Sequence, residues 1–100
     1  MAGAVVYQIL YTEDSLEDLR VVLDYIDADN PHAAQRLGIA LLNHVELLSQ
    51  FPRLGASIQE RTGIRVMLHA PIRIYYRIHE EKPQIEVLHF WHVARRPPIV

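Results

Sequence analysis

The sequence contains no cysteine, so it can form neither a disulfide framework nor a thiolate metal site. No apolar run approaches the roughly 20 residues that span a bilayer, and the N-terminus lacks the charged and apolar regions of a signal peptide. We therefore expect a cytoplasmic protein with no membrane partner. There is also no Gly-rich phosphate loop, no nucleophile elbow and no close carboxylate pair in the C-terminal half. These absences give no reason to expect a cofactor.

Cations are scarce in the N-terminal half of the chain and carboxylates are scarce in the C-terminal half, although the net charge of the whole chain is only -2. Residues 1–52 hold two arginines against eight carboxylates, a balance of -6, whereas residues 53–100 hold eight cations against four carboxylates, a balance of +4. Lysine occurs once, at Lys82. An anionic partner should therefore meet the C-terminal half, and a general nucleic-acid coat is disfavoured. The length of 100 residues predicts one domain, residues 1–100.

The last third of the chain predicts three consecutive strands. In residues 64–69 and 72–79, apolar residues alternate with arginine or histidine, which is the pattern of a strand with one buried face. One face should therefore be core and the other a row of cations. Ala70-Pro71 is expected in the first turn and residues 80–83 in the second. The third run, residues 85–93, has apolar neighbours at Val87-Leu88 and at Phe90-Trp91, and this change of phase indicates a bulge or a central strand covered on both faces.

The N-terminal half predicts a strand followed by two helices. Residues 5–11 are rich in β-forming side chains, and Thr12 then offers an N-cap hydroxyl. Asn30-Pro31 starts a second helix, which Phe51-Pro52 ends. Apolar stripes at helical spacing should face the sheet; they are Leu16, Leu19, Leu23 and Ile26 in the first helix, and Ala34, Leu37, Leu41, Val45 and Leu48 in the second. The acidic stripe of the first helix is interpreted as a solvated face.

These elements predict an α+β domain in the order β-α-α-β-β-β. A long antiparallel helical hairpin should pack on one face of a largely antiparallel four-stranded sheet. Residues 53–63 contain two glycines and mixed polarity, and are expected to be a connecting loop. The sheet face away from the helices should carry many of the arginines.

Arginine and histidine are the candidate functional residues. Guanidinium groups on a common face would bind phosphates or carboxylates, or would simply be solvated and pair with Glu60, Glu80 or Glu86. The residues concerned are Arg65, Arg73, Arg77, Arg95 and Arg96. His92 and Arg95 would supply a general base beside a charge stabiliser, or His92 would cap the sheet and bond a backbone carbonyl. The spacing of His69, His79 and His89 is not a ligand motif, so no metal site is predicted.

The order and spacing of these features resemble the RelE/ParE superfamily of toxins from bacterial type II toxin-antitoxin (plasmid stabilisation) systems. The resemblance covers nearly the whole chain, although no single motif is specific. It is carried by the residues 51–55 (FPRLG), an isolated Arg65, the run 73–78 (RIYYRI), and residues 85–92 leading into a His-x-x-Arg-x-Pro motif. The resemblance implies the fold described above and a cytoplasmic toxin that forms a hetero-oligomer with its antitoxin.

The superfamily contains two activities of different classes. RelE-like members are ribosome-dependent endoribonucleases that cut mRNA, and ParE-like members poison DNA gyrase. The long helical hairpin, the single lysine and the net charge of -2 favour the ParE-like activity. We therefore expect a gyrase inhibitor neutralised by a cognate ParD-like antitoxin, with the five arginines named above binding partners. The antitoxin is expected to cover the cationic sheet face and the apolar grooves beside the helical hairpin. The alternatives are a nuclease acting on ribosome-bound mRNA through Arg65, His92 and Arg95, and a non-toxic member that only binds antitoxin.

Overall fold

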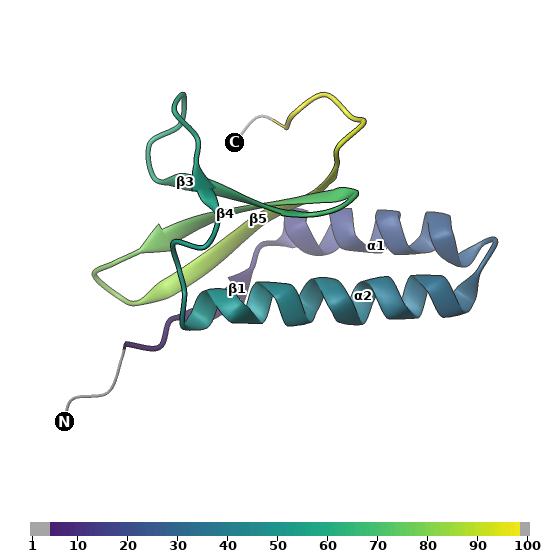
Figure 1. Ribbon diagram of the computed structural model, residues 1–100, viewed down its shortest axis with the longest axis horizontal. Coiled ribbons are helices and arrows are strands. Elements are labelled where there is room, and N and C mark those ends of the chain that lie inside the picture. The colour runs from purple at the N-terminus through teal and green to yellow at the C-terminus, as the bar shows by residue number, and fades with distance from the viewer. Residues whose placement is uncertain (1–4, 99–100) are drawn as a thin grey trace.

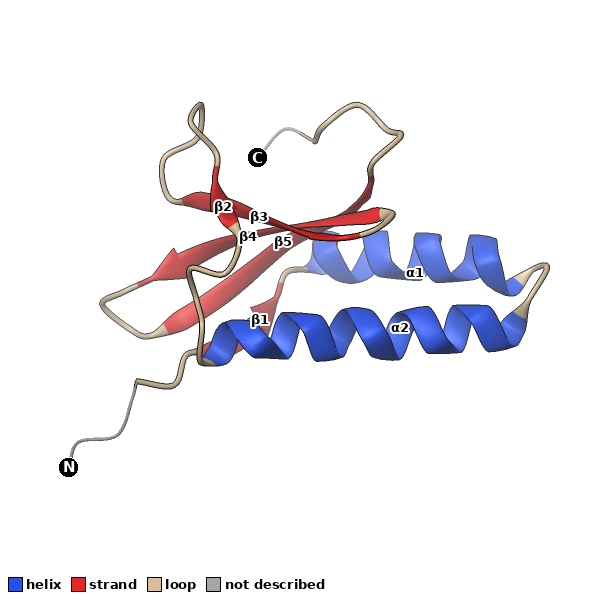
Figure 2. Cartoon of the chain, in the orientation of Figure 1, coloured by secondary structure: helices blue, strands red, loops and turns tan. Residues whose placement is uncertain are grey.

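A helical hairpin packs on one face of a five-stranded sheet in the computed structural model, which describes residues 5–98 (Figure 1). Figure 2 shows the two helices lying side by side below the sheet. The elements are β1 (Gln8–Tyr11), α1 (Glu13–Asp27), α2 (Pro31–Glu46), the 3-10 turn η1 (Leu47–Ser49), β2 (Ala56–Ser57), β3 (Ile64–His69), β4 (Ile72–His79) and β5 (Gln84–His92). The predicted α+β class is confirmed. Neither helix is long and apolar enough to cross a bilayer, within the residues described.

The starts of both helices are confirmed, and side chains cap them. The Thr12 hydroxyl accepts a hydrogen bond from the Ser15 amide at 3.0 Å and donates one to the Val87 carbonyl at 3.0 Å. It therefore caps α1 and ties the helix to β5. The Asn30 side chain accepts from the Ala33 amide at 3.0 Å, with Pro31 at the first helical position. Each cap satisfies an amide that the first turn of a helix leaves without a partner.

The strand order is β1-β5-β4-β3-β2, with β1 parallel to β5 and the other pairs antiparallel. The prediction of four strands was wrong by one. Residues 53–63, expected to be a loop, contain β2, in which Ala56 and Ser57 pair with Val66 and Arg65 of β3. The first strand is also shorter than predicted, because pairing begins only at Gln8. Both edge strands are short, which limits unwanted pairing with other chains.

The predicted irregularity in the last strand is a β-bulge at Leu88. Tyr75 pairs with His89 and Tyr76 pairs with Val87, so Leu88 has no partner on β4. The bulge lies where β1 ends, because the last β1–β5 pair joins Tyr11 to Val87. The Thr12 amide then donates to the Val87 carbonyl at 3.1 Å. Beyond this point α1 replaces β1 beside β5.

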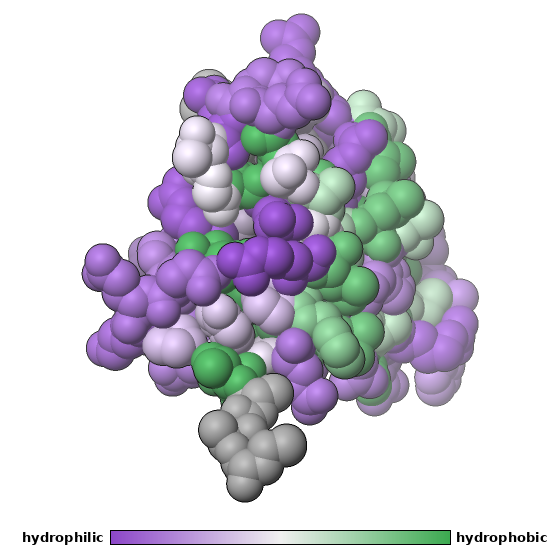
Figure 3. Space-filling view, turned by 60° about the vertical axis from the view of Figure 1, so that its left-hand side comes forward, coloured by the Kyte–Doolittle hydropathy of each residue, from purple (hydrophilic) through white to green (hydrophobic). Residues whose placement is uncertain are grey.

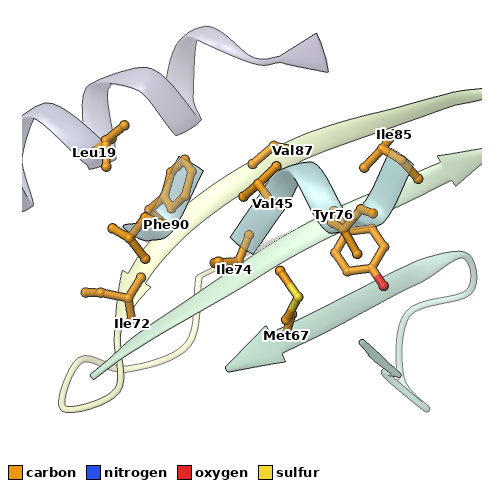
Figure 4. Packing of buried hydrophobic residues seen from close by; sticks show 11 residues of the cluster. Leu19, Val45, Met67, Ile72, Ile74, Tyr76, Ile85, Val87 and Phe90 are labelled. Atoms are coloured by element: carbon orange, nitrogen blue, oxygen red, sulfur yellow. The ribbon is translucent and has the colours of Figure 1, made fainter. Parts of the chain in front are cut away.

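The core lies between α2 and the central strands (Figure 4). It is formed by fully buried residues of α2, η1, β4 and β5, which are Leu41, Val45, Leu48, Ile72, Ile74, Tyr76, Ile85, Val87 and Phe90. The predicted α2 stripe is buried except at Leu37, which is half-buried. In α1, the prediction for Leu16 was wrong: this side chain is 51% exposed, and Ser15 is buried instead. Burial of Ser15 is possible because its hydroxyl donates to the Thr12 carbonyl at 2.8 Å.

Candidate partner-binding site

The register of β3 and β4 divides the arginines between the two faces of the sheet. Arg65 is opposite Tyr76 and shares the helix-covered face with the buried Met67 and Ile74. Arg73 and Arg77 have the opposite phase on β4 and lie on the uncovered face. The expectation of one shared row therefore holds for Arg73 and Arg77 and is wrong for Arg65. Opposed residues of an antiparallel pair lie on one face, so a shift of one residue changes the face.

Arg65 holds the loop before β2 in place. Its Nη1 atom donates to the Gly55 carbonyl at 2.6 Å, and the Gly55 amide donates to the Tyr76 hydroxyl at 2.9 Å. Tyr76 in turn donates to the Pro52 carbonyl at 2.7 Å. Burial raises the pKa of Tyr76, against the Gly55 hydrogen bond and the nearby Arg65 charge, so the phenol keeps its proton. Arg65 is therefore bonded within the fold at this position.

The residues proposed for a nuclease site are not all close together. Arg65 pairs with Tyr76 and His92 pairs with Ile72, four residues further along β4 and on its other side. At about 3.3 Å per residue and about 4.8 Å between strands, their backbones are roughly 16 Å apart. A general base and its partner need contact within about 3 Å, directly or through one water. His92 and Arg95 lie together, and Arg65 lies apart from them.

His92 and Arg95 form a tight turn at the end of β5. The Arg95 amide donates to the His92 carbonyl at 3.0 Å, and His92 Nδ1 accepts from the Ala94 amide at 3.0 Å. His92 thus bonds a backbone amide rather than the carbonyl that was one alternative. The Arg95 guanidinium lies 3.7 Å from the centre of the Trp91 ring, and Trp91 Nε1 donates to the Arg96 carbonyl at 2.7 Å. The turn therefore carries an arginine stacked on the only tryptophan.

The uncovered face of the sheet combines cations with apolar and aromatic side chains. Arg73 lies between Leu68 and Trp91, and Arg77 lies opposite Glu86. No carboxylate makes an ion pair with Arg65, Arg73 or Arg77 anywhere in residues 5–98. Of the three glutamates considered as their partners, Glu80 pairs with Arg53 at 2.8 Å and Glu86 with His79 at 3.0 Å, and Glu60 makes no ion pair within residues 5–98. Arg73 Nη1 makes one long hydrogen bond, to the Val93 carbonyl at 3.5 Å. The charges of Arg73 and Arg77 therefore remain available to an anionic group.

The acidic stripe of α1 is solvated except at Asp18. Glu17 and Asp24 both pair with Arg20, and all three side chains are more than half exposed. Asp18 instead bonds His89 Nδ1 at 2.7 Å, with both side chains about 15% exposed. His89 also meets Trp91 edge to face, at 5.4 Å between ring centres. The interpretation of this stripe as wholly solvated was wrong at this residue, which connects α1 to β5.

The histidines considered as metal ligands each have a different neighbour. His69 Nδ1 lies 2.8 Å from His44 Nδ1, His79 bonds Glu86 and His89 bonds Asp18. Burial, with the neighbouring His69 as a smaller cause, lowers the pKa of His44. Within the described part of the chain, no group of three potential ligands is close enough to hold a metal ion.

An apolar groove lies between the helical hairpin, the β3–β4 turn and the end of β5. Its volume is about 590 Å³, and it is lined by Val21, Val22, Tyr25, Ile26, Leu37, Pro71, Ile72, His92 and Arg95. Val21 and Tyr25 are strongly exposed, Tyr25 at 82%. Its shape and lining suit apolar side chains, with His92 and Arg95 available to a nearby carboxylate.

Apolar grooves beside the helical hairpin were expected, but their lining residues were not predicted, although the sequence contained a signal for two of them. Val21 and Tyr25 are spaced i, i+4 among the acidic residues of α1, outside the stripe that faces the core. Apolar residues at such a spacing on a solvated face indicate a partner surface. The groove itself depends on how the hairpin docks on the sheet, which this spacing does not specify.

Comparisons with known proteins identify the family. Residues 9–97 match the family described as ParE toxin of type II toxin-antitoxin system, parDE. A solved structure of the chromosomal ParDE TA system from P. aeruginosa is 21% identical, covers 87% of this chain and 96% of the matched chain, and has a TM-score of 0.73. The RelBE2 toxin-antitoxin complex from Mycobacterium tuberculosis is 24% identical, with coverage of 88% and 99% and a TM-score of 0.66.

These two likenesses concern the fold, and they confirm the fold predicted from the resemblance. A search of curated protein sequences found no match. The family match spans most of the chain, from β1 to the turn that carries Arg95. The chain belongs to the family of ParE toxins of type II toxin-antitoxin systems.

Proposed function

We propose that this toxin inhibits DNA gyrase by binding it, without a catalytic step, and that a ParD-like antitoxin neutralises it. The family match and the likeness to a ParDE structure support this proposal. The observation that carries it is the separation of Arg65 from His92 and Arg95. A nuclease built on these three residues would need them around one scissile phosphate. Arg65 instead bonds the Gly55 carbonyl, at the far end of the sheet.

The apolar groove is the proposed seat of an antitoxin helix. An amphipathic helix that folds on binding would place its apolar side chains against Val22, Ile26 and Leu37. An acidic residue on that helix would then reach Arg95. A further stretch of antitoxin would cover Arg73 and Arg77 on the uncovered face, because neither has a carboxylate partner within residues 5–98.

The gyrase proposal is tested by two assays run in parallel on the purified chain. One contains gyrase, supercoiled DNA and ATP, and the other contains ribosomes translating a defined mRNA. Accumulation of cleaved gyrase–DNA complexes with intact mRNA is the expected result. Cut mRNA with unaffected gyrase would refute the proposal.

Substitutions on the groove wall test the antitoxin site. Val21→Asp and Tyr25→Ala change exposed side chains, so the fold should be retained. Binding of the cognate antitoxin, measured by calorimetry, should weaken at least about tenfold, because the anchors of the groove are lost. The matched control is Val6→Asp, which changes a 66% exposed side chain that precedes β1 and belongs neither to the groove lining nor to strands β3 to β5. Equal affinities for the three variants would reject the groove as the antitoxin site.

Ribosome-dependent mRNA cleavage is the second candidate, and one observation favours it. His92 and Arg95 line the same groove, so a base and a cation lie close together there. Such a nuclease would need a phosphate-binding residue other than Arg65. If mRNA is cut, His92→Gln should abolish cleavage while Arg65→Lys retains it. A chain that binds antitoxin but gives neither activity would match the non-toxic alternative.

A further inference from the structure

The outer side of α2, which faces away from the sheet, carries an apolar stripe. Ile39 and Leu42 of α2, and Leu47 at the start of η1, are spaced i, i+3, i+8 and are 54%, 41% and 48% exposed. Solvent-facing helix positions are normally polar. Phe51 and Leu54, both at least half exposed, continue the apolar surface beyond the helix. In Figure 3, green hydrophobic residues gather on the right-hand side of the view, and purple hydrophilic residues dominate its left-hand side.

A shallow hollow adjoins this stripe. It has a volume of about 370 Å³ and is lined by Asn43, Glu46, Leu47, Ser49, Gln50 and Phe51. The hollow lies four to twelve residues after Ile39 on the same side of the helix, and Ile39 itself projects from that side. The surface thus presents an apolar projection near one end of α2 and a hollow near the other.

Exposed charges of opposite sign lie at the two ends of the stripe. Arg36 precedes Ile39 by one turn and Glu46 ends the helix, and both are exposed. Neither makes an ion pair within residues 5–98. They are ten residues apart, which is about 15 Å along the helix axis. A surface with a cation at one end and an anion at the other is complementary to a copy of itself turned end to end.

We propose that α2 pairs with α2 of a second copy in a two-fold, antiparallel dimer. A two-fold axis beside Leu42 brings Ile39 of each copy to the hollow of the other. The same axis brings Arg36 of each copy towards Glu46 of the other, so every contact is made twice. Two helix faces also match in shape, because ridges of side chains on one pack into grooves of the other. The paired area is modest, so the dimer should be weak and concentration-dependent.

This dimer leaves the antitoxin groove open. Leu37 lines the groove, and Ile39 follows it by two residues. At about 100° per residue, the two side chains point roughly 160° apart around the helix. Self-association and antitoxin binding therefore use opposite sides of α2. The inference stands whether gyrase or the ribosome is the target.

Cross-linking tests the axis directly, because the chain has no cysteine of its own. In Leu42→Cys, the introduced thiol meets only its own copy across the axis, so mild oxidation of the purified chain should give a covalent dimer. Leu68→Cys is the control, since its exposed side chain lies on the uncovered sheet face. Sedimentation velocity should show the unmodified chain passing from monomer to dimer as concentration rises. A monomer at every concentration would overturn the proposal, as would equal cross-linking of the two variants.

Charge reversal tests the antiparallel register. Arg36→Glu or Glu46→Arg alone replaces two attractive contacts with two repulsive ones, and each should weaken the dimer at least about tenfold. The double variant Arg36→Glu/Glu46→Arg should recover most of the affinity. Failure of the double variant to recover would overturn the register and with it the proposed dimer. If Ile39→Asp abolishes antitoxin binding and leaves self-association intact, the stripe belongs to the antitoxin and the proposal is wrong.

Discussion

Replacing Tyr76 by phenylalanine should destabilise the fold more than its single lost atom suggests. The ring is fully buried, so the variant keeps its packing. The hydroxyl, however, donates to the Pro52 carbonyl and accepts from the Gly55 amide, at 2.7 Å and 2.9 Å. These two bonds hold the loop that also receives Arg65. The perturbation is therefore confined to hydrogen bonding at one well-defined place.

The magnitude follows from the two groups that lose a partner. Gly55 is buried, and its orphaned amide should cost about 1–3 kcal/mol. The Pro52 carbonyl is only half-buried and can bind water, so its loss should cost about 1 kcal/mol. The free energy of unfolding should thus fall by about 2–4 kcal/mol. For a domain of this size, the melting temperature should drop by at least about 8 °C.

Urea unfolding of the unmodified protein and of Tyr76→Phe measures the difference in their free energies of unfolding. The midpoint should fall while the m-value stays constant, because the native surface is unchanged. Tyr75→Phe is the matched control: Tyr75 is the preceding residue on β4 and is 6% exposed. Its hydroxyl makes no hydrogen bond to the rest of the described chain, so this variant should keep most of the stability. Equal destabilisation of the two variants would refute the reasoning.

Alkaline pH gives a second test of the same hydroxyl. Because burial raises the pKa of Tyr76 in the folded state, the unfolded state loses this proton first as pH rises. Folding then becomes less favourable above about pH 10, which is the ordinary pKa of tyrosine. Phenylalanine cannot titrate, so the stability gap between the two proteins should narrow above that pH. A constant gap would show that the phenol is not shielded.

Three further outcomes are expected, each measured by urea unfolding. Leu41→Ala should lower the free energy of unfolding by about 2–5 kcal/mol, because it opens a cavity in a fully buried site. Thr12→Ala should cost more than Asn30→Ala, for which about 1 kcal/mol is typical, because Thr12 caps α1 and also bonds β5. Burial lowers the pKa of His44 in the folded state, so the unfolded state binds its proton more readily. The free energy of unfolding should therefore fall as pH drops below about 6.5, and His44→Gln should reduce this dependence on pH.

The features predicted correctly are those that local chemistry determines. Thr12 and Asn30 were recognisable as caps because a capping side chain acts within its own first turn. The bulge at Leu88 left a mark in the strand itself, since one extra residue shifts the alternation of buried positions. Each of these signals spans only a few neighbouring residues. The chain order of the helices and the three long strands followed from such signals.

The features that were missed depend on contacts between distant segments. β2 has only two residues, and it is a strand solely because Ala56 and Ser57 meet β3. Leu16 was predicted to be buried from periodicity, but the angle at which α1 meets β5 buries Ser15 instead. Asp18 leaves the solvated stripe for the same reason, because its partner His89 is 71 residues away. Periodicity shows that a helix has a buried face but does not set its rotation precisely.

The division of the arginines shows why the functional site was the least predictable part. Arg65 and Arg73 both alternate with apolar residues, so each strand alone predicts an exposed guanidinium. Pairing fixes the outcome, since Arg65 opposes Tyr76 whereas Arg73 opposes Leu68. Arg65 lies on the helix-covered face and bonds the Gly55 carbonyl, whereas Arg73 lies on the other face and has no carboxylate partner within residues 5–98. The same register that keeps Arg65 from His92 thus leaves Arg73 and Arg77 for a partner, which favours a binding toxin over a nuclease built on Arg65.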